Sequence, residues 1–416
     1  MPTSFTLDNG LRVVLAPSAT DTVYAGIAVA AGTRDELDSE SGMAHFVEHM
    51  SFKGTARLTS VQILNRMESV GGDLNAYTGK EETVYYSVFL REHLGRALPL
   101  LIDIVFGSIF PQAELEKERE VVIDEIESYR DSPADLIYDD FEALLFPGHP
   151  LGRNILGNAE SLRQYTSDDL LAFTSRLYSP PRAVLFVKGN VSESEIRKYA
   201  GPSNSTLRAM SDATGAGLST PSGANAPSLE GRVGGAPVTY KKSTHQAHVM
   251  LGARAFALSD PQHIGLSLLS NLLGGPAMNS RLSLALRERS GLVYTVESSL
   301  TPYTDTGVWA VYFGCDHADV SRCLRLVRRE LSRLVDSPLA QRTLDAARRQ
   351  LKGQMAIAAD NFENSALAMG KQFLHTGRVV TLADRFAQLD DLTPHTLHNI
   401  AAQVFDPDRL TTLIYE

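Results

Sequence analysis

The feature that most constrains this chain is the heptapeptide Ala44–Met50, which reads Ala-His-Phe-Val-Glu-His-Met. In an α-helix, residues three and four apart share a face, so His45, Glu48 and His49 would point the same way. Two imidazoles at i and i+4 can bind one zinc ion from a single turn, with a carboxylate beside them. The common order in such metal-binding helices is H-E-x-x-H, and here it is inverted to H-x-x-E-H. A chance cluster on an amphipathic helix is the alternative, so a third ligand must be found.

A second segment, Glu114–Tyr129, is rich in strong helix formers and offers that ligand. A helical wheel separates an apolar stripe (Leu115, Val122, Ile126 and Tyr129) from a solvated acidic face (Glu116, Glu120, Asp124 and Glu127). Glu118 and Glu125 fall instead inside the apolar arc between Val121 and Tyr129. Carboxylates are rarely buried unless they are paired or bound to metal. We therefore expect a metal ligand and a supporting carboxylate; the alternative is a charged helix with two snorkelling glutamates.

The combined pattern resembles the pitrilysin/insulinase family of metallopeptidases, in its mitochondrial-processing-peptidase-like branch. The interval from His49 to Glu125 is the one found in that family, and Glu118 matches its second acidic residue. The flanking text is similar too, in the segments Ala31-Gly-Thr-Arg-Asp-Glu36, Phe52-Lys-Gly-Thr55 and Gly71-Gly-Asp-Leu-Asn-Ala-Tyr-Thr78. The resemblance extends along nearly the whole chain.

The resemblance implies a catalytic zinc site. His45, His49 and Glu125 would bind one Zn²⁺ per chain and leave a position open for water. The zinc would lower the pKa of that water, and Glu48 would take its proton before attack on the scissile carbonyl. Glu118 would orient a ligand or a neighbouring group from behind.

The resemblance also assigns residues that meet the substrate. Arg287 would fix the peptide and Tyr294 would stabilise the oxyanion, at the zinc site of the opposing half-molecule. Without the resemblance, they would be interpreted as a surface arginine and a core tyrosine. In a short chain this arrangement requires a homodimer in which both residues act in trans. An edge strand containing Asn75, Ala76 and Tyr77 could receive an extended peptide by β-augmentation.

The organisation of the chain predicts an α+β fold with two homologous repeats, each a mostly antiparallel sheet packed with helices. At one constant offset, Thr166, Leu170, Tyr178 and Arg182 recur as Thr393, Leu397, Phe405 and Arg409. Residues 201–236 are rich in Ser, Gly, Ala and Pro, which is typical of a flexible linker. We expect a zinc-binding domain at 1–200 and a second domain without a metal site at 237–416. Ser39 or Ser41 is expected to cap the zinc helix.

The composition of the chain limits the classes of protein to which it can belong. The 416 residues contain 43% hydrophobic and 21% charged residues, as in globular proteins. A net charge of −10 argues against nucleic-acid binding. The longest apolar run, Leu98–Phe110, is too short to span a membrane and contains Asp103. With only Cys315 and Cys323, and no visible secretory signal, the cytoplasm is the expected compartment.

These observations together predict a zinc metalloendopeptidase that hydrolyses peptides or unfolded polypeptide segments. The alternative is a non-catalytic or partner subunit of a heterodimeric complex that resembles the processing peptidase. Such subunits typically lack part of the metal set, whereas this chain carries the zinc ligands, Glu48, Arg287 and Tyr294 together.

Overall fold

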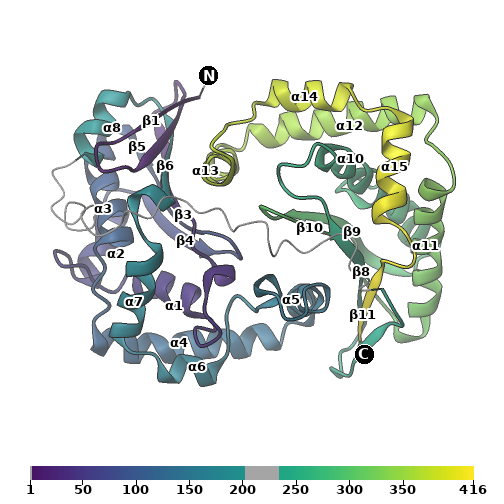
Figure 1. Ribbon diagram of the computed structural model, residues 1–416, viewed down its shortest axis with the longest axis horizontal. Coiled ribbons are helices and arrows are strands. Elements are labelled where there is room, and N and C mark those ends of the chain that lie inside the picture. The colour runs from purple at the N-terminus through teal and green to yellow at the C-terminus, as the bar shows by residue number, and fades with distance from the viewer. Residues whose placement is uncertain (1, 202–233) are drawn as a thin grey trace. The chain divides into compact units, whose positions relative to one another are not determined.

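The computed structural model describes residues 2–201 and 234–416. The described residues form two compact units. The first comprises residues 2–128, 153–201 and 358–379, and the second comprises 129–152, 234–357 and 380–416. Figure 1 labels the helices and strands of both.

The first unit is built on a six-stranded sheet of order β1-β2-β6-β3-β5-β4. Its strands are β1 (Thr3–Thr6), β2 (Arg12–Pro17), β3 (Thr22–Val29), β4 (Asp73–Thr78), β5 (Thr83–Leu90) and β6 (Ala183–Gly189). Only β2 and β6 pair in parallel; the other neighbours are antiparallel. The helices are η1 (Thr33–Asp35), α1 (Met43–Met50), α2 (Ser60–Glu68), η2 (Arg91–His93), α3 (Leu94–Phe106), α4 (Gln112–Arg130), α6 (Ala159–Gln164), α7 (Ser167–Leu177), η4 (Pro180–Arg182), α8 (Glu193–Ala200) and α13 (Phe362–Thr376).

Both faces of this sheet are buried, because successive side chains of a strand point to opposite sides. Ile27 of β3 and Leu185 of β6 pack with helices such as α1, α3 and α7 in one core cluster. Ala28 and Phe186, one position further along, pack against α13 in another cluster. The near-continuous apolar run of β3 follows from this burial on two sides.

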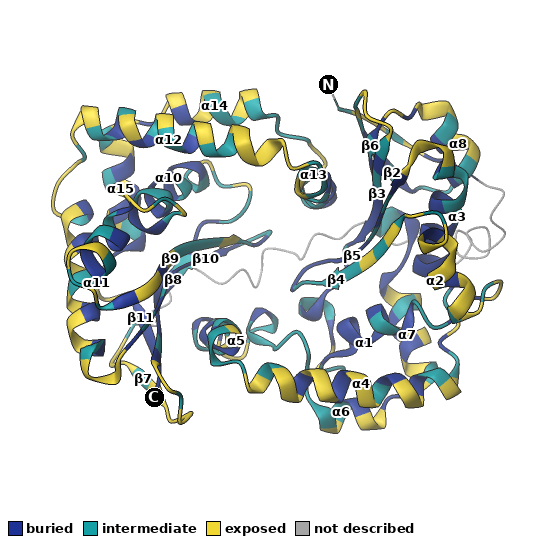
Figure 2. Ribbon diagram, turned by 180° about the vertical axis from the view of Figure 1, so that it is seen from behind, coloured by how far each residue is buried: buried dark blue, intermediate teal, exposed yellow. Residues whose placement is uncertain are grey.

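The second unit contains a five-stranded sheet of order β7-β11-β8-β10-β9. Its strands are β7 (Val238–Tyr240), β8 (Ala247–Ala255), β9 (Val293–Pro302), β10 (Gly307–Cys315) and β11 (Thr411–Tyr415). The helices are α5 (Pro133–Leu145), η3 (Pro150–Gly152), α10 (His263–Gly274), η6 (Ser283–Glu288, a π-helical turn), η7 (His317–Asp319), α11 (Val320–Val335), α12 (Gln341–Ala359), α14 (Leu382–Asp390) and α15 (Pro394–Val404). Figure 2 shows the pattern that folding around a core requires, with buried strands and exposed outer helix faces.

The two sheets have the same topology once the extra edge strand β1 is set aside. β7, β11, β8, β10 and β9 take the places of β2, β6, β3, β5 and β4, and again only the first pair is parallel. The predicted α+β fold with two repeats of a mostly antiparallel sheet is confirmed.

The compact units differ from the expected sequence boundaries, because two helices are exchanged. Helix α5 belongs to the first repeat but packs on the second sheet, where Tyr303 Oη donates a 2.6 Å hydrogen bond to Glu142. Helix α13 belongs to the second repeat but packs on the first sheet, where Lys188 Nζ donates a 2.8 Å hydrogen bond to Ser365 Oγ. Most of the expected linker, residues 202–233, lies outside the described residues.

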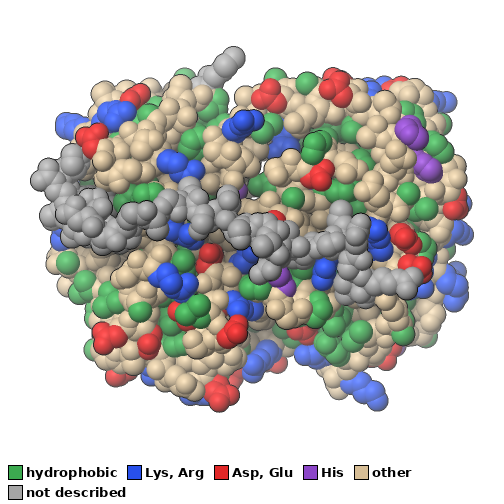
Figure 3. Space-filling model, viewed as in Figure 1, with side chains coloured by type: hydrophobic (Ala, Val, Ile, Leu, Met, Phe, Trp, Pro, Cys, Tyr) green, Lys and Arg blue, Asp and Glu red, His purple; other side chains and the backbone are tan. Residues whose placement is uncertain are grey.

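The described helices include none that is both long and apolar enough to cross a membrane. On the face shown in Figure 3, acidic and basic side chains are interspersed. The net charge of −10 is therefore not gathered into one patch among the described residues on this face.

Candidate metal centre and active site

Helix α1 carries the H-x-x-E-H motif and is embedded in the first unit. Seven of its eight residues are buried, including His45 and Glu48. The expected serine cap is wrong: the N-cap residue is Gly42, at φ +81°, and it has no capping side chain. The carboxylate of Glu36 accepts hydrogen bonds from the backbone N–H groups of Gly42 (3.3 Å) and Ala44 (3.0 Å) instead. The buried Glu36 side chain thus satisfies two N–H groups at the start of the helix, although burial raises its pKa to about 8.

The other end of α1 is fixed by a buried hydroxyl network. Ser51 Oγ donates to the carbonyl of Val47 at 2.8 Å and lies 3.1 Å from the hydroxyl of Tyr85 in β5. Tyr85 in turn lies 3.2 Å from the hydroxyl of Tyr178, which follows α7. The motif is therefore held on a rigid helix rather than on a loop.

His45, His49 and Glu125 come together with potential ligand atoms within 4.8 Å of one another. Glu125 Oε2 lies 3.4 Å from His49 Nε2 and 3.9 Å from His45 Nε2. Two ligands at about 2.0–2.1 Å from a tetrahedral zinc ion are themselves about 3.4 Å apart. The spacing and the two-imidazole, one-carboxylate donor set both fit zinc.

Glu118 contacts the same histidine from the other side. His49 Nδ1–H donates a 2.9 Å hydrogen bond to Glu118 Oε1, which leaves His49 Nε2 facing Glu125. The second oxygen of Glu118 lies 2.6 Å from Lys53 Nζ. Burial opposes ionisation of Glu118, but the bonds from His49 and Lys53 lower its pKa. An ionised partner on Nδ1 fixes the tautomer and the ring orientation that metal binding by Nε2 needs.

Helix α4 supplies both carboxylates, but it buries them unequally. The residue Glu118 is 8% exposed, as the wheel predicts. The side chain of Glu125 is 44% exposed, and Val121 is 52% exposed. The expectation that both glutamates lie in the apolar arc is therefore wrong for Glu125. It stands at the rim of that arc, where a carboxylate can reach the histidines and still contact water.

The two histidines have opposite pKa shifts. Burial, together with the charge of His49, lowers the pKa of His45 to about 4. Burial alone would lower the pKa of His49 as well, but hydrogen bonds to Glu118 and Glu125 raise it to about 9. Without a metal ion, a proton on His49 therefore offsets the charge of the two carboxylates, and a divalent cation bound there would displace this proton.

Glu48 lies beside this set, on the same face of α1. Its Oε2 accepts a 2.7 Å hydrogen bond from Thr78 Oγ1, at the end of strand β4. Burial raises the pKa of Glu48, although the bond from Thr78 and the charge of His49 lower it in part. A raised pKa makes this carboxylate a stronger base than an ordinary glutamate.

Strand β4, which contains Asn75, Ala76 and Tyr77, is the edge strand of the first sheet. It pairs with β5 on one side, and no strand among the described residues pairs with its other edge. Ala76 packs on the α1 side of the sheet, and Tyr77 packs on the α13 side. Asn75 donates a 2.8 Å hydrogen bond to Asp73 within the strand.

Arg287 and Tyr294 lie in the second unit. Arg287 is in η6, with its Nε 2.9 Å from Glu288 Oε1. Tyr294 is in β9, which has the same edge position in its sheet as β4 has in the first. Tyr294 is 88% exposed, so interpreting it as a core residue is wrong.

Two family models match consecutive parts of the chain. The model described as "Insulinase (Peptidase family M16)" matches residues 12–159, and "Peptidase M16 inactive domain" matches residues 164–351. The uncharacterized zinc protease YmxG of Bacillus subtilis is 32% identical over 414 residues, which cover 99% of this chain and 97% of that protein. This chain belongs to the M16 peptidase family. The family resemblance noted from the motif is confirmed.

Further relatives of this M16 chain agree with that placement. The mitochondrial-processing peptidase subunit beta of Bos taurus is 30% identical over 406 residues, which cover 95% of this chain and 80% of that protein. The crystal structure of a protease from Helicobacter pylori has the same fold, with a TM-score of 0.90, 23% identity, and coverage of 100% of this chain and 99% of that chain. Relatives named as zinc proteases support metallopeptidase activity in general terms.

Three residues at the M16 site had no role from sequence reasoning. Lys53 and Thr78 were noted only as members of segments that flank the motif, and Glu36 was not considered as a cap of the helix. Lys53 lies four residues after His49, so a helical continuation would have put the two on one side. Thr78 contacts α1 from a distant strand, and Glu36 contacts it from just beyond the positions that N-cap rules inspect.

Proposed function

We propose that this chain is a zinc-dependent metalloendopeptidase that cleaves peptides or unfolded polypeptide segments. The observation that carries the proposal is the convergence of His45, His49 and Glu125 within ligand distance, with Glu48 on the same helix face. Zinc bound by these three residues would act as a Lewis acid on the scissile carbonyl and make the attacking water more acidic.

The protein's own side chains carry the proton transfers. Glu48 accepts the proton of the attacking water on its carboxylate and returns it to the leaving amine. Thr78 holds Glu48 Oε2, so that Oε1 is the oxygen free to take the proton. Glu118 keeps His49 oriented through Nδ1, and Lys53 keeps Glu118 ionised.

The substrate would bind as an added strand on β4, along Asn75, Ala76 and Tyr77. Main-chain pairing of this kind favours extended chains over compact proteins. Thr78, at the end of the same strand, links the peptide-binding edge to Glu48.

We place Arg287 and Tyr294 at the active site of a second copy in a homodimer. Arg287 would hold the peptide, and the Tyr294 hydroxyl would stabilise the oxyanion. The 88% exposure of Tyr294 on an edge strand supports a role towards another molecule. We expect the enzyme to work in the cytoplasm with one zinc ion per chain.

The first test combines metal analysis with cleavage-site mapping. Freshly purified protein should contain about one zinc per chain, and cleavage of a mixed peptide library should stop on chelation and return with zinc. A metal-free protein that cannot be loaded, or a zinc-loaded protein without cleavage, would favour the partner-subunit alternative. A relative named as subunit beta gives that alternative its support.

A further inference from the structure

The two repeats have a buried carboxylate at equivalent positions, but the arginine side chains around it differ. At the constant offset between the repeats, Asp103 of α3 corresponds to Glu330 of α11, and Pro111 corresponds to Pro338. Both carboxylates are buried, with exposures of 5% and 4%. A buried carboxylate at this position is thus part of the fold in both units.

The first unit satisfies its carboxylate with few partners. Thr55 Oγ1 donates a 2.7 Å hydrogen bond to Asp103 Oδ2, and Arg57 Nε lies 3.7 Å from Oδ1. One hydroxyl and one arginine are therefore enough to partner the buried carboxylate of the first unit.

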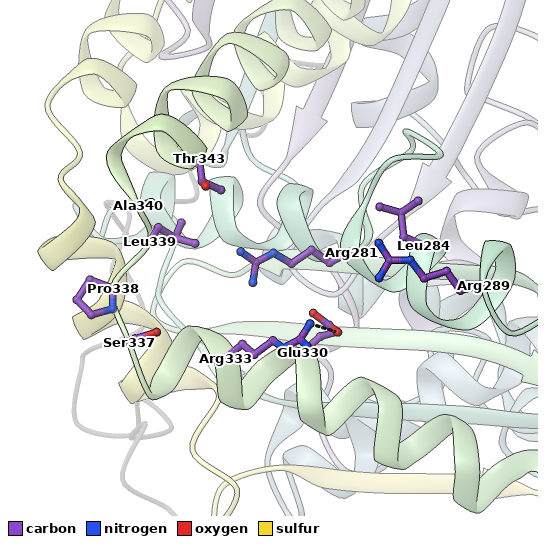
Figure 4. A pocket seen from close by; sticks show the side chains of 10 residues that line it. All are labelled: Arg281, Leu284, Arg289, Glu330, Arg333, Ser337, Pro338, Leu339, Ala340 and Thr343. Carbon is purple, nitrogen blue, oxygen red and sulfur yellow. Dashed lines mark hydrogen bonds and ion pairs between the residues drawn. The ribbon is translucent and has the colours of Figure 1, made fainter.

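In the second unit, more arginine side chains lie near the buried carboxylate than are needed to partner it. Glu330 Oε1 accepts a 2.8 Å hydrogen bond from Arg333 and lies 3.8 Å from Arg329 Nη2, so this carboxylate already has two arginine partners. Arg281 and Arg289 line the same cavity of about 380 Å³. Within the described part of the chain, their guanidinium groups make no hydrogen bond or ion pair. In Figure 4, Arg281 extends between the Glu330–Arg333 pair and the Ala340–Thr343 end of the cavity.

The lining of the cavity is positive and rich in donors. Three arginines against one glutamate leave a charge of +2, in a chain whose net charge is −10. Arg281 is only partly exposed, and burial lowers its pKa; the charge of Glu330 favours its cation, whereas the charge of Arg333 opposes it. An anion in the cavity would stabilise this cation further. The cavity also borders the start of α12, whose first carbonyl acceptor is that of Ala340. The unpaired N–H groups of a first turn add to the attraction for anions.

We propose that this cavity of the second unit is a binding site for a phosphate-type oxyanion. Planar guanidinium groups match such oxyanions in a two-pronged geometry, and the Ser337 and Thr343 hydroxyls add neutral donors. One water occupies about 30 Å³ of liquid, so a cavity of about 380 Å³ has room for a phosphate group together with its remaining waters. Glu330 holds Arg333 in place. The lining residues belong to the second unit, as do Arg287 and Tyr294, whereas the proposed zinc ligands and Glu48 belong to the first. A binding measurement on metal-free protein therefore does not depend on the proposed peptidase activity.

The test is a titration of the full chain with orthophosphate, tripolyphosphate and ATP by calorimetry, against sodium chloride of equal ionic strength. Metal-free protein is used, because phosphate also binds metal ions. We expect saturable binding of orthophosphate. Tighter binding of tripolyphosphate would identify a phosphate chain as the ligand, and still tighter binding of ATP would identify a nucleotide.

The variants are Arg281→Gln, Arg289→Gln and Arg281→Lys. Each loss of a guanidinium should raise Kd about tenfold or more, and Arg281→Lys should fall between the wild type and Arg281→Gln, because an ammonium keeps the charge but not the fork. The matched control is Arg325→Gln, on the exposed side of α11 and outside the cavity lining. If Arg281→Gln does not fold, Arg289→Gln decides, because Arg289 is exposed.

Two results would overturn the proposal. One is the absence of saturable binding above the chloride baseline in the wild type. The other is an equal loss of binding in Arg325→Gln, which would show general charge screening rather than a site.

Discussion

His49 and Glu118 lie on different helices, far apart in the chain, yet they share a 2.9 Å hydrogen bond between Nδ1 and Oε1. This bond makes the two nitrogens of His49 unequal, because one is committed to a carboxylate and the other faces Glu125. Lys53 completes the contact at 2.6 Å from the far oxygen of Glu118. The orientation of a proposed metal ligand therefore depends on two residues that bind no metal.

Replacing Glu118 by Gln should weaken zinc binding about 10- to 100-fold, because a neutral amide holds the His49 ring less firmly. Lys53→Met should act in the same direction with a smaller effect. Competition with a fluorescent chelator measures both affinities. Glu116→Gln, an exposed change on the same helix, is the control and should leave the affinity unchanged. Equal affinities in Glu118→Gln and the control would show that Glu118 has no supporting role.

Glu48→Gln should keep the zinc and lose peptide hydrolysis by a factor of about 10² to 10⁴, because it removes a proton acceptor rather than a ligand. Zinc content by atomic spectroscopy and peptide turnover are measured on the same preparation. Near-normal turnover in a zinc-loaded variant would remove Glu48 from the mechanism.

Glu125→Gln, in contrast to Glu48→Gln, should weaken zinc binding itself. An amide is a poorer zinc ligand than a carboxylate, so mild chelation should strip the metal from this variant first. Glu120→Gln, on the exposed face of α4, is the matched control. Unchanged zinc retention in Glu125→Gln would contradict its role as a ligand.

The contact between α13 and the first sheet should depend on pH through Glu82. Burial opposes ionisation, but the 2.9 Å bond from His375 and the charge of Lys371 lower the pKa of Glu82 to about 2. A lowered pKa in the folded state stabilises the protein above the usual value of about 4.5, and this contribution is lost as pH falls from 4.5 to 2. Glu82→Gln should cost on the order of 3 kcal/mol of unfolding free energy at pH 7, because it leaves buried cations without their partner.

Denaturant unfolding at pH 7 and pH 3 checks this prediction. The difference between wild type and Glu82→Gln should shrink at pH 3, because there the unfolded chain binds a proton at Glu82 while the folded chain keeps the carboxylate mostly ionised. A difference that stays constant over this range would show that the charge of Glu82 is not what stabilises the contact.

The composite dimer site can be tested by mixing two inactive variants. Glu48→Gln and Tyr294→Phe should each be nearly inactive as homodimers. If Tyr294 acts in trans, a mixed dimer has one site with both residues intact, and random assortment restores about a quarter of wild-type activity. Verified subunit exchange without recovered activity would refute the trans arrangement.

The sequence predicted what local periodicity and spacing can encode. The motif indicated α1, the wheel indicated the helix that is α4, and the constant offset between repeated residues indicated the two repeats, all of which match the structure. Glu36 was missed because N-cap rules inspect only neighbouring residues, whereas here the cap comes from further upstream. The exposure of Glu125 was misjudged because a wheel assigns directions but not the distance to the nearest packed element.

The exchange of α5 and α13 is beyond such reasoning for a different reason. An apolar stripe predicts that a helix is buried, but not which sheet it covers. Phe141 of α5 and Phe373 of α13 would give the same apolar pattern whichever of the two sheets their helix covered. The choice depends on long-range contacts that pair each repeat with a helix from the other half of the chain.

That exchange has a consequence for how the chain is made. The last strand of the first sheet ends at Gly189, and the helix that covers its second face begins only at Phe362. At about 5–20 residues per second, a ribosome needs roughly 10–30 s to synthesise the intervening segment. During this time the face that contains Val14, Val184 and Phe186 has no α13 to cover it. The nascent first unit therefore keeps an uncovered apolar face until α13 has been made, and only then can its fold be completed.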